Sequence, residues 1–145
     1  MKNLFLILLV IPTMFFSQDI VSKKQLNKEN IKDEDYRMKT FENIIKKIKI
    51  PIENVTFIKD NEEHANQIII RFDSLKDYKY NRKKNKFLGN IIVNFYPDYD
   101  TKTFFYGLLR NKLIIENKIE INKYFIKIKN LKIYSIEATD DFYHN

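Results

Sequence analysis

Alternating apolar residues in the middle of the chain restrict the fold more than any other feature. Beyond Pro51 the apolar period changes from 3.6 to 2, in segments rich in β-branched and aromatic side chains. Segment 67–73 places Ile68 and Ile70 on one face, and segment 87–96 repeats the pattern. Such alternation is typical of half-buried strands in an antiparallel sheet. A sheet of this kind is therefore expected.

Strands are also expected before and after this pair. Residues 55–59 would form the first strand, and the polar stretch 76–86 would be a loop between the two central strands. After a reverse turn at 97–100, the aromatic-rich segment 103–110 would run back along the sheet. Short turns between such strands favour a meander, in which neighbours in the sequence are neighbours in the sheet.

The C-terminal third is a low-complexity mixture of Ile, Lys and Asn, in which the apolar residues alternate with polar ones. They change from odd to even positions at 122–123 and back to odd positions at 129–130. Because residues that flank a two-residue hairpin loop face the same side, we expect a hairpin at the second change and a turn or bulge at the first. A helix over 113–121 is the alternative, and it would bury Lys118 or Asn122.

An amphipathic helix is expected over residues 33–49, ahead of the sheet. Asp33 can cap its first turn, and Pro51 stops it. Lysines gather in its final turns, where the helix dipole favours cations. Its apolar residues recur at the spacing of one helical face, namely Met38, Phe41, Ile44, Ile45 and Ile48.

Together these elements predict a single α+β domain over residues 33–138. Its fold would be one N-terminal amphipathic helix packed on an antiparallel meander of five or six strands. The polar residues 18–32 would be a spacer or a frayed lead-in, and 139–145 an acidic tail. A chain of 145 residues has enough material for one such core, and without cysteine no disulfide reinforces it.

The first seventeen residues have the layout of a secretory signal peptide. Lys2 gives a positive start, residues 4–11 are uninterruptedly apolar, and a small residue precedes a polar one at Ser17-Gln18. The apolar stretch is shorter than the roughly 20 residues that span a bilayer, which disfavours the alternative of an uncleaved anchor. We expect cleavage near Ser17 and Gln18, and export to the periplasm, the outer surface or the medium. Without cysteine the protein is not expected to be a lipoprotein.

The sequence holds no motif for a common catalytic chemistry. Gly89 and Gly107 are too far apart for a phosphate-binding loop, no serine lies in an elbow context, and there is no thiol nucleophile. Residues 60–64, and His144 beside Asp140 and Asp141, contain possible metal ligands at spacings that match no metal motif. We interpret them as a solvated loop and a tail. No catalytic residue, metal or cofactor is therefore assigned.

The basic stretch 76–86 is the candidate for contact with a polyanion or an anionic surface. Its cations can attract phosphates or lipid headgroups while its tyrosines stack or wedge. The candidate residues are Lys79, Arg82, Lys83, Lys84 and Lys86. The alternative is a solvated loop that reflects the lysine-rich composition, which gives a net charge of +7. Nucleic acid is not an expected partner, because lysine far outnumbers arginine and an exported protein rarely meets it.

Three classes of function remain open from the sequence. The favoured class is a small exported non-catalytic domain that binds a protein partner, an envelope component or an apolar ligand. The second is an enzyme in which a helix and a curved sheet enclose an acid/base pocket, for which Asp73 and Glu116 are the nearest carboxylates to apolar strands. The third is an electrostatic binder of a polyanion or membrane surface through 76–86. The sequence predicts no transmembrane span in the mature chain and sets no oligomeric state.

Overall fold

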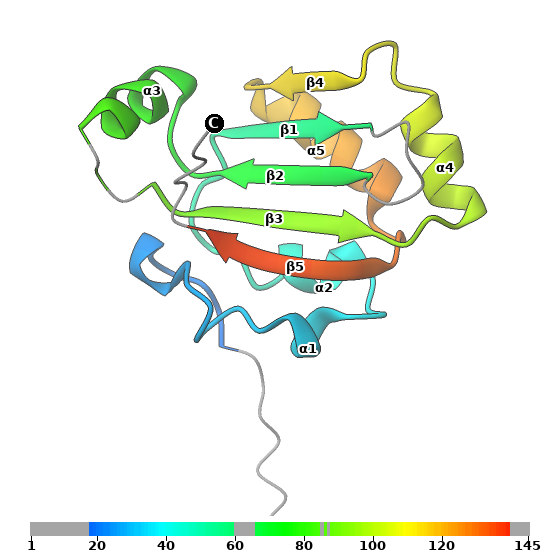
Figure 1. Cartoon of the computed structure of the whole chain (residues 1–145), viewed down its shortest axis with the longest axis horizontal. Coiled ribbons are helices and arrows are strands. Elements are labelled where there is room, and N and C mark those ends of the chain that lie inside the picture. The colour runs from blue at the N-terminus through cyan, green and yellow to red at the C-terminus, as the bar shows by residue number, and fades with distance from the viewer. Residues whose placement is uncertain (1–17, 60–65, 85, 87, 140–145) are drawn as a thin grey trace, which may run out of the picture.

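The sheet predicted from the alternating segments is present in the computed structural model, which describes residues 18–59, 66–84, 86 and 88–139 (Figure 1). Five antiparallel strands form it within those residues. They are β1 (Asn54–Ile58), β2 (Gln67–Arg71), β3 (Asn90–Phe95), β4 (Lys112–Ile115) and β5 (Ile133–Thr139). Their order is β4-β1-β2-β3-β5, so β1 to β3 form the predicted meander, while β4 and β5 join its two edges.

One face of the sheet is apolar, because the alternation continues in register across the strands. One row consists of Val55, Ile70, Ile91 and Ala138, and the next of Phe57, Ile68, Val93 and Ile136. All of these side chains are buried in the core. Since directly opposed residues share a face, polar residues such as Thr56 and Arg71 lie on the other side.

Helices cover the apolar face: α2 (Phe41–Ile45), α4 (Tyr99–Tyr106) and α5 (Lys118–Ile128). Figure 1 shows α5 behind the sheet and α4 beside its right-hand end. Aromatic rings join these helices to the strands. The ring centre of Phe95 lies 5.6 Å from that of Phe41 and 5.9 Å from that of Phe105, and Phe41 lies 5.2 Å from Phe125. The core therefore sits between these helices and the sheet.

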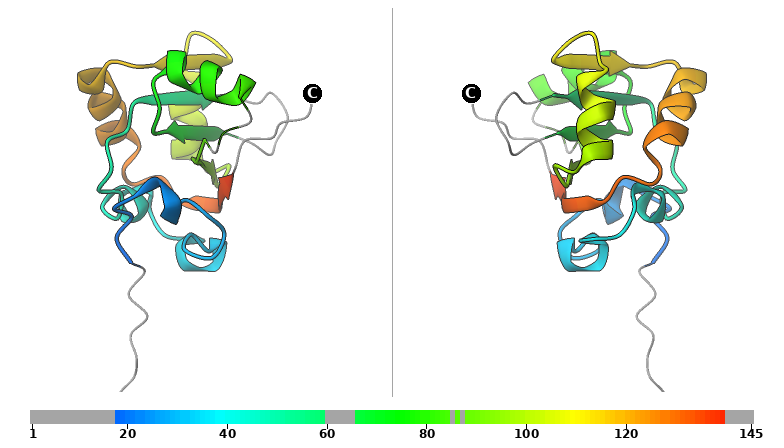
Figure 2. Two further views of the ribbon diagram at one scale, coloured as in Figure 1. Left: turned by 90° about the vertical axis from the view of Figure 1, so that its left-hand side faces the viewer. Right: turned by 90° about the vertical axis from the view of Figure 1, so that its right-hand side faces the viewer.

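The opposite face of the sheet carries α3 (Leu75–Lys83), which follows β2 (Figure 2). The buried ring of Tyr78 on this helix lies over Arg71 at the end of β2. The chain then enters β3 through Gly89, whose φ of 58° is a conformation that favours glycine. Helices thus pack on both faces of the sheet, with the large core on one face and a smaller contact on the other.

The N-terminal helix predicted over 33–49 is divided into two short helices, α1 (Asp33–Tyr36) and α2. Met38 lies between them with φ 66°. The amide of Met38 donates to the carbonyl of Ile133 at 2.9 Å, and Ile133 donates back to Lys39 at 2.9 Å. The helical hydrogen bonds are interrupted because these residues pair instead with the outer edge of β5.

The segment 18–32 is not the spacer that its polarity predicts. It contains a short 3-10 turn, η1 (Lys23–Gln25), and buries the side chains of Ile20, Leu26 and Ile31. Ile20 also forms a parallel bridge with Ile48. The three aliphatic residues lack a regular period because each enters the core from a different turn of an irregular segment.

Three helices replace strands or loops that the sequence predicts. The loop predicted over 76–86 is mostly α3, and the first half of the strand predicted over 103–110 belongs to α4. The hairpin at 129–130 and the turn at 122–123 are also wrong, because α5 extends to Ile128. The alternative helix over 113–121 is correct only in part, since β4 ends at Ile115.

Each of these helices begins at a side-chain cap. Ser74, Asp98 and Asn117 accept hydrogen bonds from the backbone amides of Asp77, Thr101 and Glu120 respectively. Capping of this kind starts a helix whatever the alternation that follows.

The predicted signal peptide, the loop 60–64 and the tail residues 140–145 lie outside the described residues.

Candidate functional site

A cleft of about 630 Å³ lies between α3 and the polar face of the sheet. We call it the basic cleft, because cations from three separate elements line it. Its lining residues are Thr56, Arg71, Leu75, Tyr78, Lys79, Arg82, Lys83, Lys112 and Ile114. Helix α3 forms one wall, and strands β1, β2 and β4 form the other.

Helix α3 presents a single face to the cleft. Leu75, Tyr78, Lys79, Arg82 and Lys83 are spaced as residues i, i+3, i+4, i+7 and i+8, which lie on one side of a helix. The face is apolar at its N-terminal end and cationic at its C-terminal end. The cap at Ser74, whose hydroxyl oxygen accepts from the amide of Asp77 at 3.1 Å, sets where this face begins.

Arg71 is held in the cleft by several neighbouring side chains. Its Nη1 donates to the Thr56 hydroxyl at 2.6 Å and to the Asn54 side-chain oxygen at 3.3 Å. Its guanidinium carbon lies 4.9 Å from the centre of the Tyr78 ring. Because Asn54 in turn donates to the carbonyl of Asp73 at 2.8 Å, the whole group is fixed to the end of β2.

Strand β4 supplies the last wall of the cleft. Ile114 pairs with Thr56, and Lys112 pairs with Ile58, so both β4 side chains lie on the polar face of the sheet. Ile114 keeps 44% of its surface exposed, which is high for an isoleucine in a strand. The cleft therefore combines cations with an apolar patch at the margin of the sheet.

Every charged residue in the lining is a cation, because none of the described residues that line the cleft is acidic. Two carboxylates lie near its end and are engaged elsewhere. Glu116 accepts a hydrogen bond from the amide of Leu75 at 3.3 Å, and Asp73 forms an ion pair with Lys23. These are the two carboxylates that the sequence singles out for an acid/base pocket, and neither lines the cleft.

The structure separates the five predicted contact residues into two groups. Lys79, Arg82 and Lys83 line the cleft, whereas Lys84 caps the end of α3 and Lys86 lies over the Tyr80 ring at 5.9 Å. Sequence reasoning missed the strand residues, chiefly Arg71, Thr56 and Lys112, whereas Tyr78 is one of the two tyrosines expected to stack or wedge. The helical spacing from Leu75 to Arg82 is a signal that could have found the α3 wall. Ser17 lies outside the described residues, and Gln18 is exposed.

A polar row continues from Arg71 across the sheet, away from the cleft. Asn54, Arg71, Asn90 and Thr139 are directly opposed on successive strands. Asn90 is only 1% exposed, and neither its side-chain nitrogen nor its side-chain oxygen has a hydrogen-bond partner among the described residues. The buried Thr139 hydroxyl has no partner in that part of the chain either. Buried polar groups without partners destabilise a fold, so this row costs stability.

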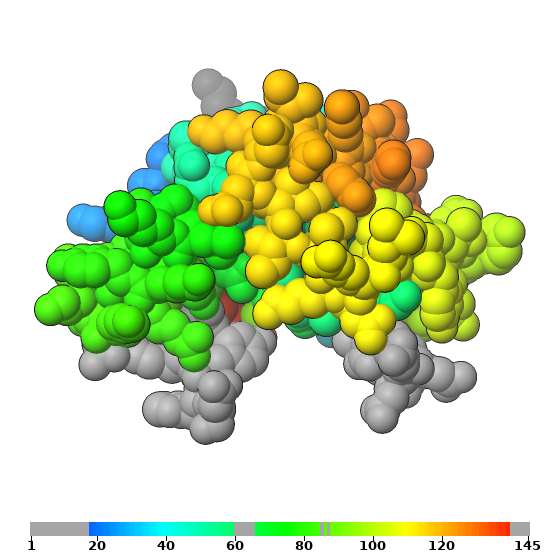
Figure 3. All heavy atoms as spheres, turned by 90° about the horizontal axis from the view of Figure 1, so that it is seen from above, coloured from blue at the N-terminus to red at the C-terminus, as the bar shows by residue number. Residues whose placement is uncertain are grey.

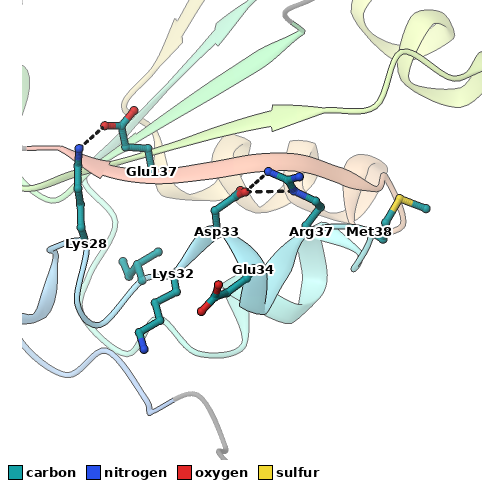
Figure 4. A pocket seen from close by; sticks show the side chains of 8 residues that line it. Lys28, Lys32, Asp33, Glu34, Arg37, Met38 and Glu137 are labelled. Carbon is teal, nitrogen blue, oxygen red and sulfur yellow. Dashed lines mark hydrogen bonds and ion pairs between the residues drawn. The ribbon is translucent and has the colours of Figure 1, made fainter.

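A second pocket, of about 890 Å³, lies at the edge of β5 (Figure 4). Four of its six charged residues form ion pairs, Lys28 with Glu137 at 3.3 Å and Arg37 with Asp33, and the other two are Lys32 and Glu34. The hydrogen bond from Arg37 to the Asp33 carboxylate, together with the attraction between their charges, raises the pKa of Arg37. Asp33 also accepts from the amide of Ile136 at 2.8 Å. The three cations and three carboxylates in the lining cancel, so this pocket has no net charge to attract an anionic ligand.

Comparisons with known proteins give no further guide to the function. A scan against protein-family models, a search of curated proteins and a search of solved structures each found no significant match. Within the described residues, no cluster of three or more histidine, cysteine or carboxylate side chains is arranged to hold a metal ion. No helix in that part of the chain is long and apolar enough to cross a membrane.

Proposed function

We propose that this protein is an exported, non-catalytic domain that binds an anionic ligand in the basic cleft. The observation that carries the proposal is the convergence of cations from three elements on one concavity. Arg71 comes from β2, Lys112 from β4, and Lys79, Arg82 and Lys83 come from α3. A lysine-rich composition supplies many cations, but the packing of α3 against the sheet brings these five together.

The electrostatics favour an anion in the cleft. Like charges that share a cleft repel one another, and low-dielectric walls increase their field. An anion between them removes the repulsion and gains charge-assisted hydrogen bonds. Arg71 adds a fork of donors that Thr56, Asn54 and Tyr78 already hold in place, so that little conformational freedom is lost on binding.

The dimensions favour carboxylates or phosphates that project from a larger ligand. A volume of about 630 Å³ falls within the range of small-molecule sites. Leu75 and Ile114 give the cleft apolar walls beside its cations. A ligand with acidic groups on an apolar frame would contact both kinds of wall.

Export is supported by the layout of residues 1–17, with a positive start, an apolar stretch and a small residue at Ser17. A domain that works outside the cytoplasm would meet acidic proteins and anionic envelope components. The mass of the exported chain tests this part of the proposal.

The cleft itself is tested by chromatography on immobilised heparin with a salt gradient. The test variant carries Gln at Lys79, Arg82, Lys83 and Lys112. The matched control carries Gln at Lys24, Lys102, Lys123 and Lys129, which are exposed outside the cleft. Both variants lose the same number of positive charges. We expect the test variant to elute at clearly lower salt than the control, because binding falls with each lost contact to the anion. Equal shifts in the two variants would mean that only total charge matters, and the proposal would fail.

A further inference from the structure

Among the residues that the structure describes, strand β4 is an open edge of the sheet, beside the basic cleft. It pairs with β1 on one side, and it stands at the end of the strand order. Seen from above in Figure 3, its surface is uncovered between α3 and α4. The other edge of the sheet, β5, is covered. Met38 and Lys39 exchange backbone hydrogen bonds with Ile133, and the Asp33 carboxylate accepts a hydrogen bond from the amide of Ile136.

The register shows which backbone groups of β4 point outward. The amide of Lys59 donates to the carbonyl of Asn111 at 2.7 Å, so residues 59 and 111 form a hydrogen-bonded pair. In an antiparallel ladder hydrogen-bonded pairs alternate with pairs whose backbone groups point away from each other. The amides and carbonyls of Lys112 and Ile114 therefore point to the open edge. Their side chains line the basic cleft.

We propose that β4 accepts an extended acidic segment of a partner protein as an additional antiparallel strand, with the carboxylates of that segment in the basic cleft. The inference rests on the proposed function and names the ligand as a peptide. Residues of the incoming strand that pair with Lys112 and Ile114 place their side chains on the cleft face of the sheet. Backbone pairing supplies affinity, and alternate side chains supply specificity.

The pattern of the peptide follows from this geometry. Every second residue faces Lys112 and the cations of α3, which favours glutamate or aspartate. The intervening residues face the side of Leu113, which packs against the hydrophobic core, and this favours aliphatic side chains. The recognised segment is therefore an alternation of acidic and apolar residues.

Charge decides between such a peptide and a second copy of this chain. The chain has a net charge of +7, and Arg110, Lys112 and Lys118 are exposed in and around β4. Pairing two β4 edges would bring these cations together, and like charges across an interface oppose association. An acidic segment is attracted by the same residues.

The test measures fluorescence anisotropy of a labelled peptide of alternating glutamate and valine, about seven residues long. Two further peptides carry N-methyl groups, one on its glutamates and the other on its valines. In an antiparallel pair the residues that face Lys112 and Ile114 use their own amides for the ladder. We therefore expect methylation of the glutamates to weaken binding at least about 10-fold, and methylation of the valines to leave it within about 3-fold.

Several results would overturn the inference, and they also separate it from the proposed function. Equal affinities of the two methylated peptides would leave anion binding intact and exclude strand addition. No binding of any peptide, with cleft-dependent retention on heparin, would likewise exclude the peptide ligand alone. Loss of both peptide binding and cleft-dependent retention on heparin would exclude the strand addition and the proposed function together. Concentration-dependent dimerisation in sedimentation velocity that Lys112→Glu strengthens would show that β4 pairs with a second copy.

Discussion

The guanidinium of Arg71 lies 4.9 Å from the ring centre of Tyr78, and this contact joins the sheet to α3. Both residues line the basic cleft, and Arg71 is also hydrogen-bonded to Thr56 and Asn54. The stacking therefore links two walls of the cleft and orients the guanidinium of Arg71. A cation over an aromatic face contributes about 0.5–2 kcal/mol, depending on how far it is desolvated.

Replacing Arg71 with Lys tests this role without a change in net charge. Both hydrogen bonds come from Nη1 of a planar guanidinium that also lies over the Tyr78 ring, and the ammonium of lysine has no plane to stack on that ring. We expect the free energy of unfolding to fall by about 1 kcal/mol and heparin retention to weaken. Arg110→Lys is the control, because Arg110 is exposed outside the cleft. Equal retention of the two variants would show that the geometry of Arg71 is unimportant.

Two asparagines on β3 are predicted to respond to substitution in opposite directions. Asn90 is buried with an unpartnered amide, whereas Asn94 accepts from Gln67 and donates to Ser135, both at 2.9 Å. Asn90→Val removes an unsatisfied group and should raise the free energy of unfolding by about 1 kcal/mol. Asn94→Val breaks two hydrogen bonds and should lower it by about 1 kcal/mol. Urea denaturation of both variants measures the difference, and changes of the same sign would contradict this reasoning.

The capped edge of β5 gives a third prediction. Asp33→Ala removes the acceptor of the Ile136 amide and the ion pair with Arg37. We expect a loss of about 1–2 kcal/mol in stability and faster hydrogen exchange at the Ile136 amide. Glu34→Ala serves as the control, because this exposed neighbour should change stability by less than about 0.5 kcal/mol. Unchanged exchange at Ile136 would show that the cap is not formed in solution.

The strands of the meander could be predicted from the sequence because burial on one face leaves a period of 2. The boundaries of β1 and β2 differ from the prediction by only one or two residues. The helices α4 and α5 could not be separated from strands in the same way. Ile121, Phe125 and Ile128 are buried at helical spacing, but isoleucines at neighbouring positions also fit an alternating pattern. The caps at Asp98 and Asn117 were the better signal, since they depend on local hydrogen bonding.

The candidate site was predicted only as far as it is local in the sequence. The charge of the 76–86 stretch indicates the α3 wall, although the polarity of this stretch predicts a loop where the structure has a helix. Arg71 precedes this helix, and Lys112 lies on a strand that returns to the far side of β1. No spacing rule relates such residues, because only the strand order brings them together. The cleft therefore required the topology of the sheet.

The proposed export makes a prediction about where the mature chain begins. Ile20 is buried, donates to the carbonyl of Lys47 at 2.7 Å and accepts from the amide of Lys49 at 2.9 Å. Cleavage near Ser17 and Gln18 would retain these contacts, so the mass of the exported protein should correspond to a first residue no later than Ile20. Ile20→Ala should lower the free energy of unfolding by about 2–4 kcal/mol.

The exposed neighbour Val21 supplies the control for this variant. Val21→Ala should have an effect within about 0.5 kcal/mol, because 62% of that side chain is exposed. A mature chain that begins beyond Ile20 and keeps full stability would show that the N-terminal segment is dispensable, and the predicted cleavage position would then be wrong. A full-length mass in the exported fraction would instead identify an uncleaved anchor.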